Sequence, residues 1–487
     1  MDAQAHQTPP PRSLTHSQTL LIVLGVLLPV FMGSLDNTIL ASALPTIGRE
    51  FGDVHNLPWL VTAYLIANTA VTALYGKISD IYGRRRSLII AVSLYMAGSL
   101  VCALAPNMFV LILGRVLHGL GGGGLSSMGM IVLGDLVSPK ERGRYYGYFS
   151  VIYTTAGGSG PLLGGLIAEH LHWSVIFWIN IPMGLAALAI TSSLLRRLPR
   201  YERPHVLDIV GAALIVSASV SFMLAVSAGG VRYPWTSLPI IALFAVALIM
   251  GMLFVMRLVT APEPLIPVAI LRNPIVRCAI TANAFGWGSI IGLNVFLPMY
   301  LQIVMGLSPA EAGLSLVVFM VALNTSAGLH GQVLGRVRRY KLVPMLGLLV
   351  SIAAVATLAW RAGAMTTLEL ELTLIAIGAG FGPLPSITAV AMQNVVARHQ
   401  LGISVGTMNF SRNLFATMLI AVFGAIVLAG APAGQALVDA VQAGAAEAAQ
   451  AFGRVFLAAA ASMSVALIAL VVMEEKPLQT SAEIDAR

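Results

Sequence analysis

The stretch Gly76-Lys77-Ile78-Ser79-Asp80-Ile81-Tyr82-Gly83-Arg84-Arg85-Arg86 separates two apolar runs. The runs, at about 57–76 and 86–105, each approach the roughly 20 residues that a helix needs to cross a membrane. Gly83 predicts a tight turn, and the basic residues around it predict a cytoplasmic loop, where Lys and Arg gather. A basic anchor does not explain Asp80. The stretch therefore predicts two membrane helices joined by a short loop that has a further role.

The composition of the whole chain supports this interpretation. Of its 487 residues, 57% are hydrophobic and only 10% are charged, against about 25% charged in soluble domains; the mean hydropathy is +0.87. These values exclude a soluble enzyme, a disordered protein and a secreted disulfide scaffold. Cys102 and Cys278 lie in separate apolar runs and form no metal-binding pair. The predicted fold class is an all-α polytopic membrane protein.

Fourteen apolar segments are long enough to span a bilayer. Residues 1–17 are polar, show no convincing cleavage site, and are predicted to be a cytoplasmic tail. The predicted spans are 18–42, 57–76, 86–105, 108–137, 145–169, 173–195, 207–228, 236–256, 274–304, 309–334, 341–360, 367–393, 402–430 and 451–473.

The distribution of Lys and Arg predicts the orientation. With the N-terminus inside, 22 of the 28 basic residues lie on the cytoplasmic side and four lie outside. The remaining two, Arg115 and Arg412, fall within spans. This asymmetry predicts that both termini are cytoplasmic. It also excludes a nucleic-acid-binding protein, because the net charge of +8 is a topology signal.

A degenerate internal repeat suggests two related halves. A shift of 259 residues places three alternate glycines of the fourth span, beginning at Gly119, on glycines of the twelfth span, beginning at Gly378. The same shift places Gly143 on Gly402. Parallel six-helix repeats place a substrate site near the midplane and allow alternating access. The predicted organisation is a tail at 1–17, a six-helix bundle at 18–200, two inserted helices at 201–272, a second bundle at 273–474 and a cytoplasmic tail at 475–487.

The loop quoted first fits G-x-x-x-D-x-x-G-R-[RK] and resembles the signature of the major facilitator superfamily. This resemblance implies a cytoplasmic latch made by Gly76, Asp80, Gly83, Arg84 and Arg85. The first glycine would allow close packing on the other half, and the acid would pair with Arg and face a helix N-terminus, where negative charge is favoured. The expected partner is the span at 402–430. The corresponding loop of the second half, 331–339, lacks the acid, so only one complete latch is expected.

Asp36 is the only acid well inside a span, and Arg115 lies at nearly the same depth in the fourth span. A charge inside a membrane is costly, so both are candidate functional residues. An Asp36–Arg115 ion pair that proton uptake breaks would suit a proton-coupled switch. The alternatives are a packing acid bonded to Ser or Asn and an Arg that snorkels to the interface. Leu35-Asp36-Asn37-Thr38-Ile39 and the R-x-x-x-G beginning at Arg115 also resemble drug:proton antiporters.

The fifth span carries the sequence Gly160-Pro161-Leu162-Leu163-Gly164-Gly165. Pro161 removes a backbone hydrogen bond, and the glycines permit close helix approach. Ordinary small-residue packing explains this run, but G-P-x-x-G-G also resembles the antiporter motif of exporters. The sequence Phe177-Trp178-Ile179-Asn180-Ile181-Pro182 further resembles the fourteen-helix QacA/EmrB subgroup, which matches the predicted number of spans.

Four residues are candidates for a substrate cavity: His118, Trp287, Asn409 and Arg412. His118 has two interpretations, a polar packing residue or a proton carrier, and Arg412 fits a structural network as well as a cavity. Two other motifs are discounted. The G-x-G-x-x-G at 119–124 lies inside a span instead of following a strand, and the two His and one Glu at 169–172 are too few for a metal site.

The predicted function is proton-coupled export of small amphiphilic compounds, a multidrug efflux antiporter in the bacterial inner membrane. It would need substrate, protons and a lipid bilayer, with the proton gradient as the energy source, and no cofactor, metal or catalytic residue. No ATP-binding or hydrolase motif is present in the sequence. Export of a dedicated lipid, siderophore or other metabolite is an alternative, and a non-transporting sensor or scaffold is another. Whether a periplasmic adaptor is needed is left open.

Overall fold

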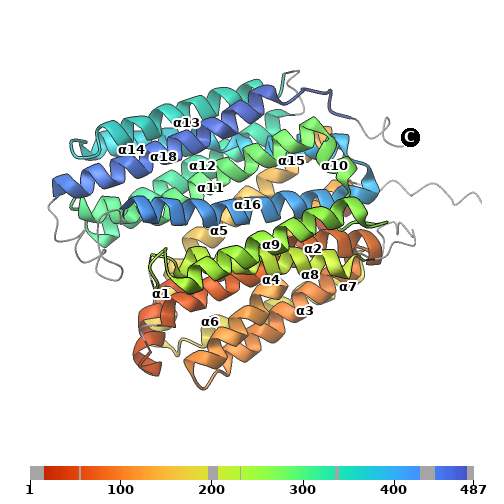
Figure 1. Cartoon of the computed structure of the whole chain (residues 1–487), viewed down its shortest axis with the longest axis horizontal. Helices are drawn as coiled ribbons and strands as arrows, with labels where there is room; N and C mark the ends of the chain where they lie inside the picture. The colour runs from red at the N-terminus through yellow and green to blue at the C-terminus, as the bar shows by residue number, and fades with distance from the viewer. Residues whose placement is uncertain are drawn as a thin grey trace, which may run out of the picture.

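The computed structural model describes residues 16–53, 56–195, 207–230, 232–334, 339–427 and 445–479. Within these ranges the regular structure is helical, apart from one isolated bridge between Gly229 and Tyr233. Most of the predicted N-terminal tail and the last eight residues lie outside these ranges. Figure 1 shows the long helices running side by side in one bundle.

The helices up to residue 260 are long except for α6. They are α1 (His16–Phe51), α2 (Leu57–Tyr82), α3 (Arg84–Ala103), α4 (Met108–Leu136), α5 (Pro139–His170), α6 (Val175–Trp178), α7 (Asn180–Leu194), α8 (Ile209–Ala228) and α9 (Leu238–Thr260).

The remaining elements form the second part of the bundle. They are α10 (Val268–Arg272), α11 (Pro274–Ile303), α12 (Pro309–Leu334), α13 (Leu342–Trp360), α14 (Thr367–Phe381), α15 (Pro383–Val395), the short 3₁₀ helix η3 (Arg398–Gln400), α16 (Leu401–Val427) and α18 (Ala445–Val472).

Thirteen helical stretches among the described residues are long and apolar enough to cross a membrane. The helix α5 is not among them. It has 32 residues, and its glycine-rich and polar sequence makes it less apolar than the other long helices. An all-α polytopic membrane protein is therefore confirmed.

The helices extend beyond several predicted spans. The first span was predicted to end at residue 42, yet α1 continues to Phe51, and α2 continues six residues past its predicted end to Tyr82. The predicted span at 367–393 consists of two helices, because α14 ends at Phe381 and α15 begins at Pro383. Proline lacks an N–H and has a fixed φ, which favours the first turn of a new helix.

The contacts among the helices fall into two groups. In the first group α4 packs on α2 and α3, and α1 packs on α4, α5 and α7. In the second group α11 packs on α16 and α18, and α14 packs on α12 and α13. The two groups meet where α2 contacts α16 and where α5 contacts α12. We call these two lines of contact the α2–α16 seam and the α5–α12 seam.

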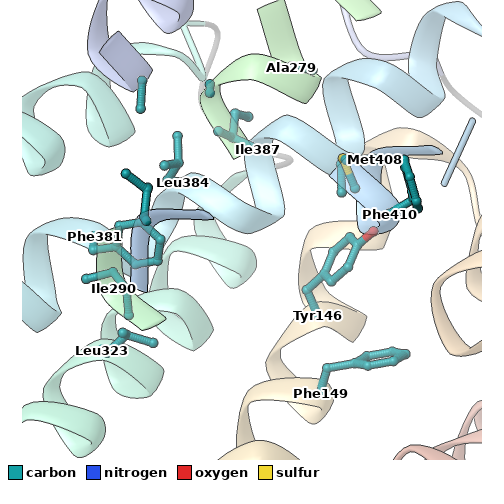
Figure 2. Close-up of a cluster of buried hydrophobic side chains, with 14 of the residues drawn as sticks. Tyr146, Phe149, Ala279, Ile290, Leu323, Phe381, Leu384, Ile387, Met408 and Phe410 are labelled. Carbon is teal, nitrogen blue, oxygen red and sulfur yellow. The ribbon is translucent and has the colours of Figure 1, made fainter. Parts of the chain in front are cut away.

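The inside of this junction is packed with apolar side chains. Figure 2 shows Tyr146 and Phe149 of α5 on one side, and Met408 and Phe410 of α16 on the other. All four are less than 10% exposed. Many apolar side chains are instead exposed on the outside of the bundle, above all on α9. Lipid rather than water suits such a surface, as expected for a multi-pass membrane protein.

Candidate functional site

Asp36 and Arg115 form an ion pair between α1 and α4. The Arg115 Nη1 atom donates to Asp36 Oδ2 at 2.7 Å and to Oδ1 at 3.0 Å. Both side chains are almost completely buried, at 1% and 0% exposed. In such a place each charge needs the other, because an unpaired charge keeps its full desolvation cost. Snorkelling of Arg115 to the interface does not fit this geometry.

Two groups of α2 complete the surroundings of Arg115. Its Nε atom donates to the Leu60 carbonyl oxygen at 2.9 Å. The guanidinium carbon lies 4.3 Å from the centre of the Tyr64 ring, within the range of a cation–π interaction. The ion pair therefore connects α1, α2 and α4.

His118 completes this buried cluster. Its Nδ1 atom lies 3.0 Å from Arg115 Nη1, and its ring centre lies 3.9 Å from that of Tyr95. Because a guanidinium only donates hydrogen bonds, His118 Nδ1 must accept, which assigns the hydrogen to Nε2. The side chain is 0% exposed and is packed among aromatic rings. In this conformation His118 therefore belongs to the buried cluster with Asp36 and Arg115; its place in a substrate cavity stays a prediction.

Asp80, near the end of α2, reaches across the α2–α16 seam to the first residues of α16. Its Oδ1 atom accepts from the Gly402 N–H at 3.0 Å, and Oδ2 accepts from the Ile403 N–H at 2.8 Å. These N–H groups belong to the first turn of α16, which has no intrahelical acceptor for them. The carboxylate thus satisfies two backbone donors, and its negative charge is stabilised by the positive end of the α16 helix dipole.

Arg84 lies between two carboxylates. It donates to Asp80 Oδ1 at 2.5 Å and to Asp135 Oδ2 at 2.6 Å, and also to the Ser79 hydroxyl at 2.8 Å. Asp135 lies near the end of α4 and is not among the predicted latch residues. No local spacing indicated this contact, because it joins residues 51 positions apart.

Gly76 and Gly402 lie in backbone contact at the same seam. A Cβ atom on Gly76 would lie 2.3 Å from the Gly402 carbonyl oxygen, so any larger residue would push the two helices apart. Gly83 has a φ of +87°, which L-residues with side chains rarely adopt. Arg85 donates from Nε to the Ser192 carbonyl oxygen at 3.0 Å, so it ties α3 to α7 instead of reaching α16.

The α5–α12 seam has a related contact without an acid. A Cβ atom on Gly143 would lie 2.4 Å from the Gly331 carbonyl oxygen. Arg142 donates to Gln393 Oε1 at 3.0 Å and so joins the two halves. Gly143 and Gly402 correspond in the predicted repeat, and each lies in a glycine contact between the halves. Residues 335–338 of the second loop are outside the described residues.

The helix-5 motif contributes one close approach. A Cβ atom on Gly160 would lie 1.9 Å from Thr38 Oγ1 in α1, whereas one on Gly165 would have no atom within 4 Å. Thr38 also donates to the Ala156 carbonyl oxygen at 3.0 Å. Gly164 is buried, and α5 continues as one helix through Pro161. The motif therefore presses α5 against α1 two residues after Asp36.

Gly160→Ala is expected to destabilise the protein by about 1–3 kcal/mol, the usual cost of overpacking a close contact. Gly165→Ala is the matched control, because it adds the same methyl group to open space in the same helix. Thermal unfolding in detergent would measure both. Equal stability of the two variants would contradict the assigned α1–α5 contact.

Three of the predicted cavity residues lie on α11 and α16. The Arg412 guanidinium carbon is 5.7 Å from the centre of the Trp287 ring, and Arg412 lies near Tyr153 of α5. Asn409 is buried and donates to the Ser127 hydroxyl of α4 at 3.3 Å. Among the described residues no carboxylate pairs with Arg412. Arg412 and Trp287 therefore lie near the junction of the halves. Asn409 connects the two halves through its hydrogen bond to Ser127.

The two discounted motifs have structural explanations. The glycines from Gly119 to Gly123 lie in the middle of α4. Cβ atoms on Gly119, Gly121 and Gly123 would collide with the backbone of α2 or α3, and one on Gly122 would collide with a side chain of α2. They permit close packing of three helices. His172 lies 3.1 Å from Glu50 Oε1, and Trp173 donates to Glu50 Oε2 at 2.7 Å, so these residues hold a loop against the end of α1.

Long parallel helices in two packed groups, with a buried ion pair in the membrane, define a helical membrane transporter. A family model described as Major Facilitator Superfamily matches residues 26–419. The chain belongs to this superfamily; it is a transporter and not an enzyme.

Relatives from bacteria and fungi are similar over most of the chain. A protein named Multidrug transporter protein MdtP from Bacillus subtilis is 33% identical over 87% of this chain and 77% of its own length. One named Efflux pump dotC from Dothistroma septosporum is 32% identical over 84% of this chain and 71% of its own. Among solved structures, the human organic anion transporter MFSD10 superposes with a TM-score of 0.65 at 16% identity, covering 93% of this chain and 99% of its own.

Proposed function

We propose that this chain is a proton-coupled antiporter that exports small amphiphilic compounds. The observation that carries the proposal is the buried Asp36–Arg115 pair with His118 beside it. Proton uptake by Asp36 would remove its negative charge and leave Arg115 without a counter-charge, so the packing of α1, α2 and α4 would respond to the proton. Relatives named multidrug transporters and efflux pumps support export as the direction.

We infer that α5 also crosses the membrane, which gives the fourteen helices of the QacA/EmrB-like subgroup. At 1.5 Å per residue its 32 residues extend about 48 Å, and it packs along α1 and α12, which are both membrane-spanning candidates. An even number of crossings places both termini on one side. The excess of Lys and Arg in the loops on that side supports placing both termini on the cytoplasmic side of a bacterial inner membrane.

In this proposal residues 76–86 and the start of α16 form a cytoplasmic latch, closed in this conformation. Asp80 and the glycine contacts hold both seams together at the end that carries Arg84 and Arg142. Rocking of one six-helix half against the other would break these contacts and expose the substrate region to the cytoplasm. We place that region near Trp287 and Arg412.

The decisive experiment measures proton and substrate movement together. When a transported amphiphile is added outside liposomes that contain the purified protein, protons should leave the liposomes. A panel of toxic amphiphiles should also be less effective against a host that lacks its main pumps but expresses this chain. Substrate movement without proton movement would contradict antiport. If a single metabolite but none of the panel moves, the dedicated exporter is the better description. No transport of any compound would favour the sensor or scaffold.

A preference for neutral or monovalent substrates over dications is expected. Asp36 is already paired with Arg115, and Arg412 adds a positive charge near the junction of the halves. A divalent cation there would lack compensating carboxylates in a medium of low dielectric. Paired export assays with a monovalent and a bivalent quaternary ammonium compound of matched hydrophobicity would measure the preference. Equal or faster export of the bivalent compound would contradict it.

A further inference from the structure

A groove of about 870 Å³ lies along the α5–α12 seam. Its position on the helices places it on the outside of the bundle. Val151 of α5 and Leu329 of α12 line it and are 62% and 59% exposed. Tyr146, on another face of α5, is buried and accepts from Gln393 of the other half; Figure 2 shows it beside Met408 and Phe410. The groove therefore opens toward the surrounding lipid and not toward the junction of the halves.

The groove extends from one membrane surface toward the middle of the bilayer. Arg144 of α5 and Gln332 of α12 line one end, next to the Gly143–Gly331 contact. Thr155 and Asn324 line the other end. The eleven helical steps from Arg144 to Thr155 correspond to about 16 Å of helix. Thr155 lies at the middle of the 32-residue α5. The groove thus reaches roughly halfway across the membrane.

The groove is polar where lipid chains would otherwise contact protein. Thr155, Thr325 and Gln332 line it and are exposed. Polar groups facing hydrocarbon are unfavourable, so this lining sets the groove apart from an ordinary lipid-facing surface and marks it as a candidate binding surface. Arg144 is the one charged side chain in the lining, which contains no carboxylate. The lining therefore favours a ligand with a single anionic group near Arg144 and an apolar chain along Val151 and Leu329.

The other seam differs because extra helices cover it. The helix α8 packs on both α2 and α16, and α9 packs on α8; Figure 1 shows this pair lying along α2 and α16. Over the described residues, the main packing partners of α5 and α12 are helices of the two six-helix halves. The inserted pair thus closes the α2–α16 seam to lipid and leaves the α5–α12 seam accessible.

We propose that this groove binds a single-chain anionic amphiphile that enters from the cytoplasmic leaflet on its way to export. The proposal rests on the export function proposed above. In this conformation Gly143 and Gly331 are in backbone contact at the seam, so the groove ends blindly. When the halves separate at this end, the same seam opens and the bound amphiphile gains a route toward Arg412.

Photolabelling tests binding directly, independently of transport. The full-length protein in liposomes is irradiated with a fatty acid that carries a diazirine in its chain. Labelled residues are expected within 144–155 and 324–332. Gly328→Leu should reduce this labelling at least fivefold, because a Cβ atom there meets nothing within 4 Å and the side chain would fill the groove. Gly313→Leu is the matched control, in the same helix, equally open and outside the groove.

The charge of the probe tests the role of Arg144. An amine with the same chain and diazirine should label the groove several times less than the fatty acid, and Arg144→Gln should abolish this difference. Equal labelling by both probes in the unmodified protein would overturn the anionic preference. Labelling that Gly328→Leu does not change would overturn the binding site.

Two further arms distinguish the occupant and the role. If a photoreactive phosphatidylglycerol labels the groove and excess fatty acid does not displace it, a resident lipid occupies the site and the proposal is overturned. If the unmodified protein exports the fatty acid and Gly328→Leu exports it equally fast, entry through the groove is overturned. If the groove is labelled but no amphiphile is exported, the proposed export function fails and the binding site stands.

Discussion

Asp36→Asn is expected to abolish export driven by a pH gradient, while the protein remains in the membrane. Asparagine keeps the size of the side chain and cannot exchange a proton at this position. It also leaves the buried Arg115 without its counter-charge, and removal of one partner of a buried pair costs about 3–5 kcal/mol. Export by reconstituted protein, normalised to the amount inserted, would measure the loss. If this variant exports substrate under a pH gradient at the wild-type rate, Asp36 is not part of the coupling mechanism.

A double variant separates coupling from stability. Asp36→Asn combined with Arg115→Gln removes both charges, so no unpaired charge remains in the low-dielectric interior. We expect the double variant to recover most of the thermal stability that the single variant loses, and to remain inactive under a pH gradient. Recovery of proton-driven export together with stability would show that the pair is structural. The hydrogen bond from Arg115 to Leu60 is lost in this variant, so full recovery of stability is not expected.

Local sequence patterns predicted the helices and the contacts that depend on helix geometry. Counting 1.5 Å per residue placed Asp36 and Arg115 at similar depth, and the structure pairs them at 2.7 Å. The resemblance of the loop at 76–86 implied that Asp80 pairs with a nearby Arg, and the structure bonds Asp80 to Arg84 across the turn at Gly83. Their proposed roles in coupling and latching stay predictions, because the geometry alone does not measure transport.

Contacts between distant segments could not be predicted in this way. Asp135 reaches Arg84 across 51 positions, and Gln393 reaches Arg142 across 251, so no local spacing connects them. His118 was ambiguous for a related reason. Its depth was evident from the sequence, but the direction of its side chain depends on how α4 packs against Tyr95. The helix ends were also missed, because backbone hydrogen bonds continue past the apolar part of a span.

Asp80→Asn is expected to open the latch end of the bundle. The substitution removes the negative charge from two hydrogen bonds to the backbone of α16 and from the bond with Arg84. An amide has one acceptor oxygen, so one N–H of α16 would face the amide nitrogen, a second donor. A loss of about 2 kcal/mol would change the ratio of closed to open molecules roughly thirtyfold. Pulsed spin-label distances between Tyr82→Cys and Leu342→Cys, both 51% exposed before substitution, would show a longer-distance population.

Asp135→Asn is the matched control for the latch. Asp135 also pairs with Arg84, at 2.6 Å, but both residues belong to the first half, so its loss weakens α3–α4 packing without touching α16. We therefore expect Asp135→Asn to lower the thermal stability and to leave the distance distribution nearly unchanged. If both variants open the end equally, Arg84 rather than the Asp80–α16 bond holds the latch. If Asp80→Asn leaves the distances unchanged, the two backbone bonds do not hold the halves together, and the glycine contacts alone account for the closed end.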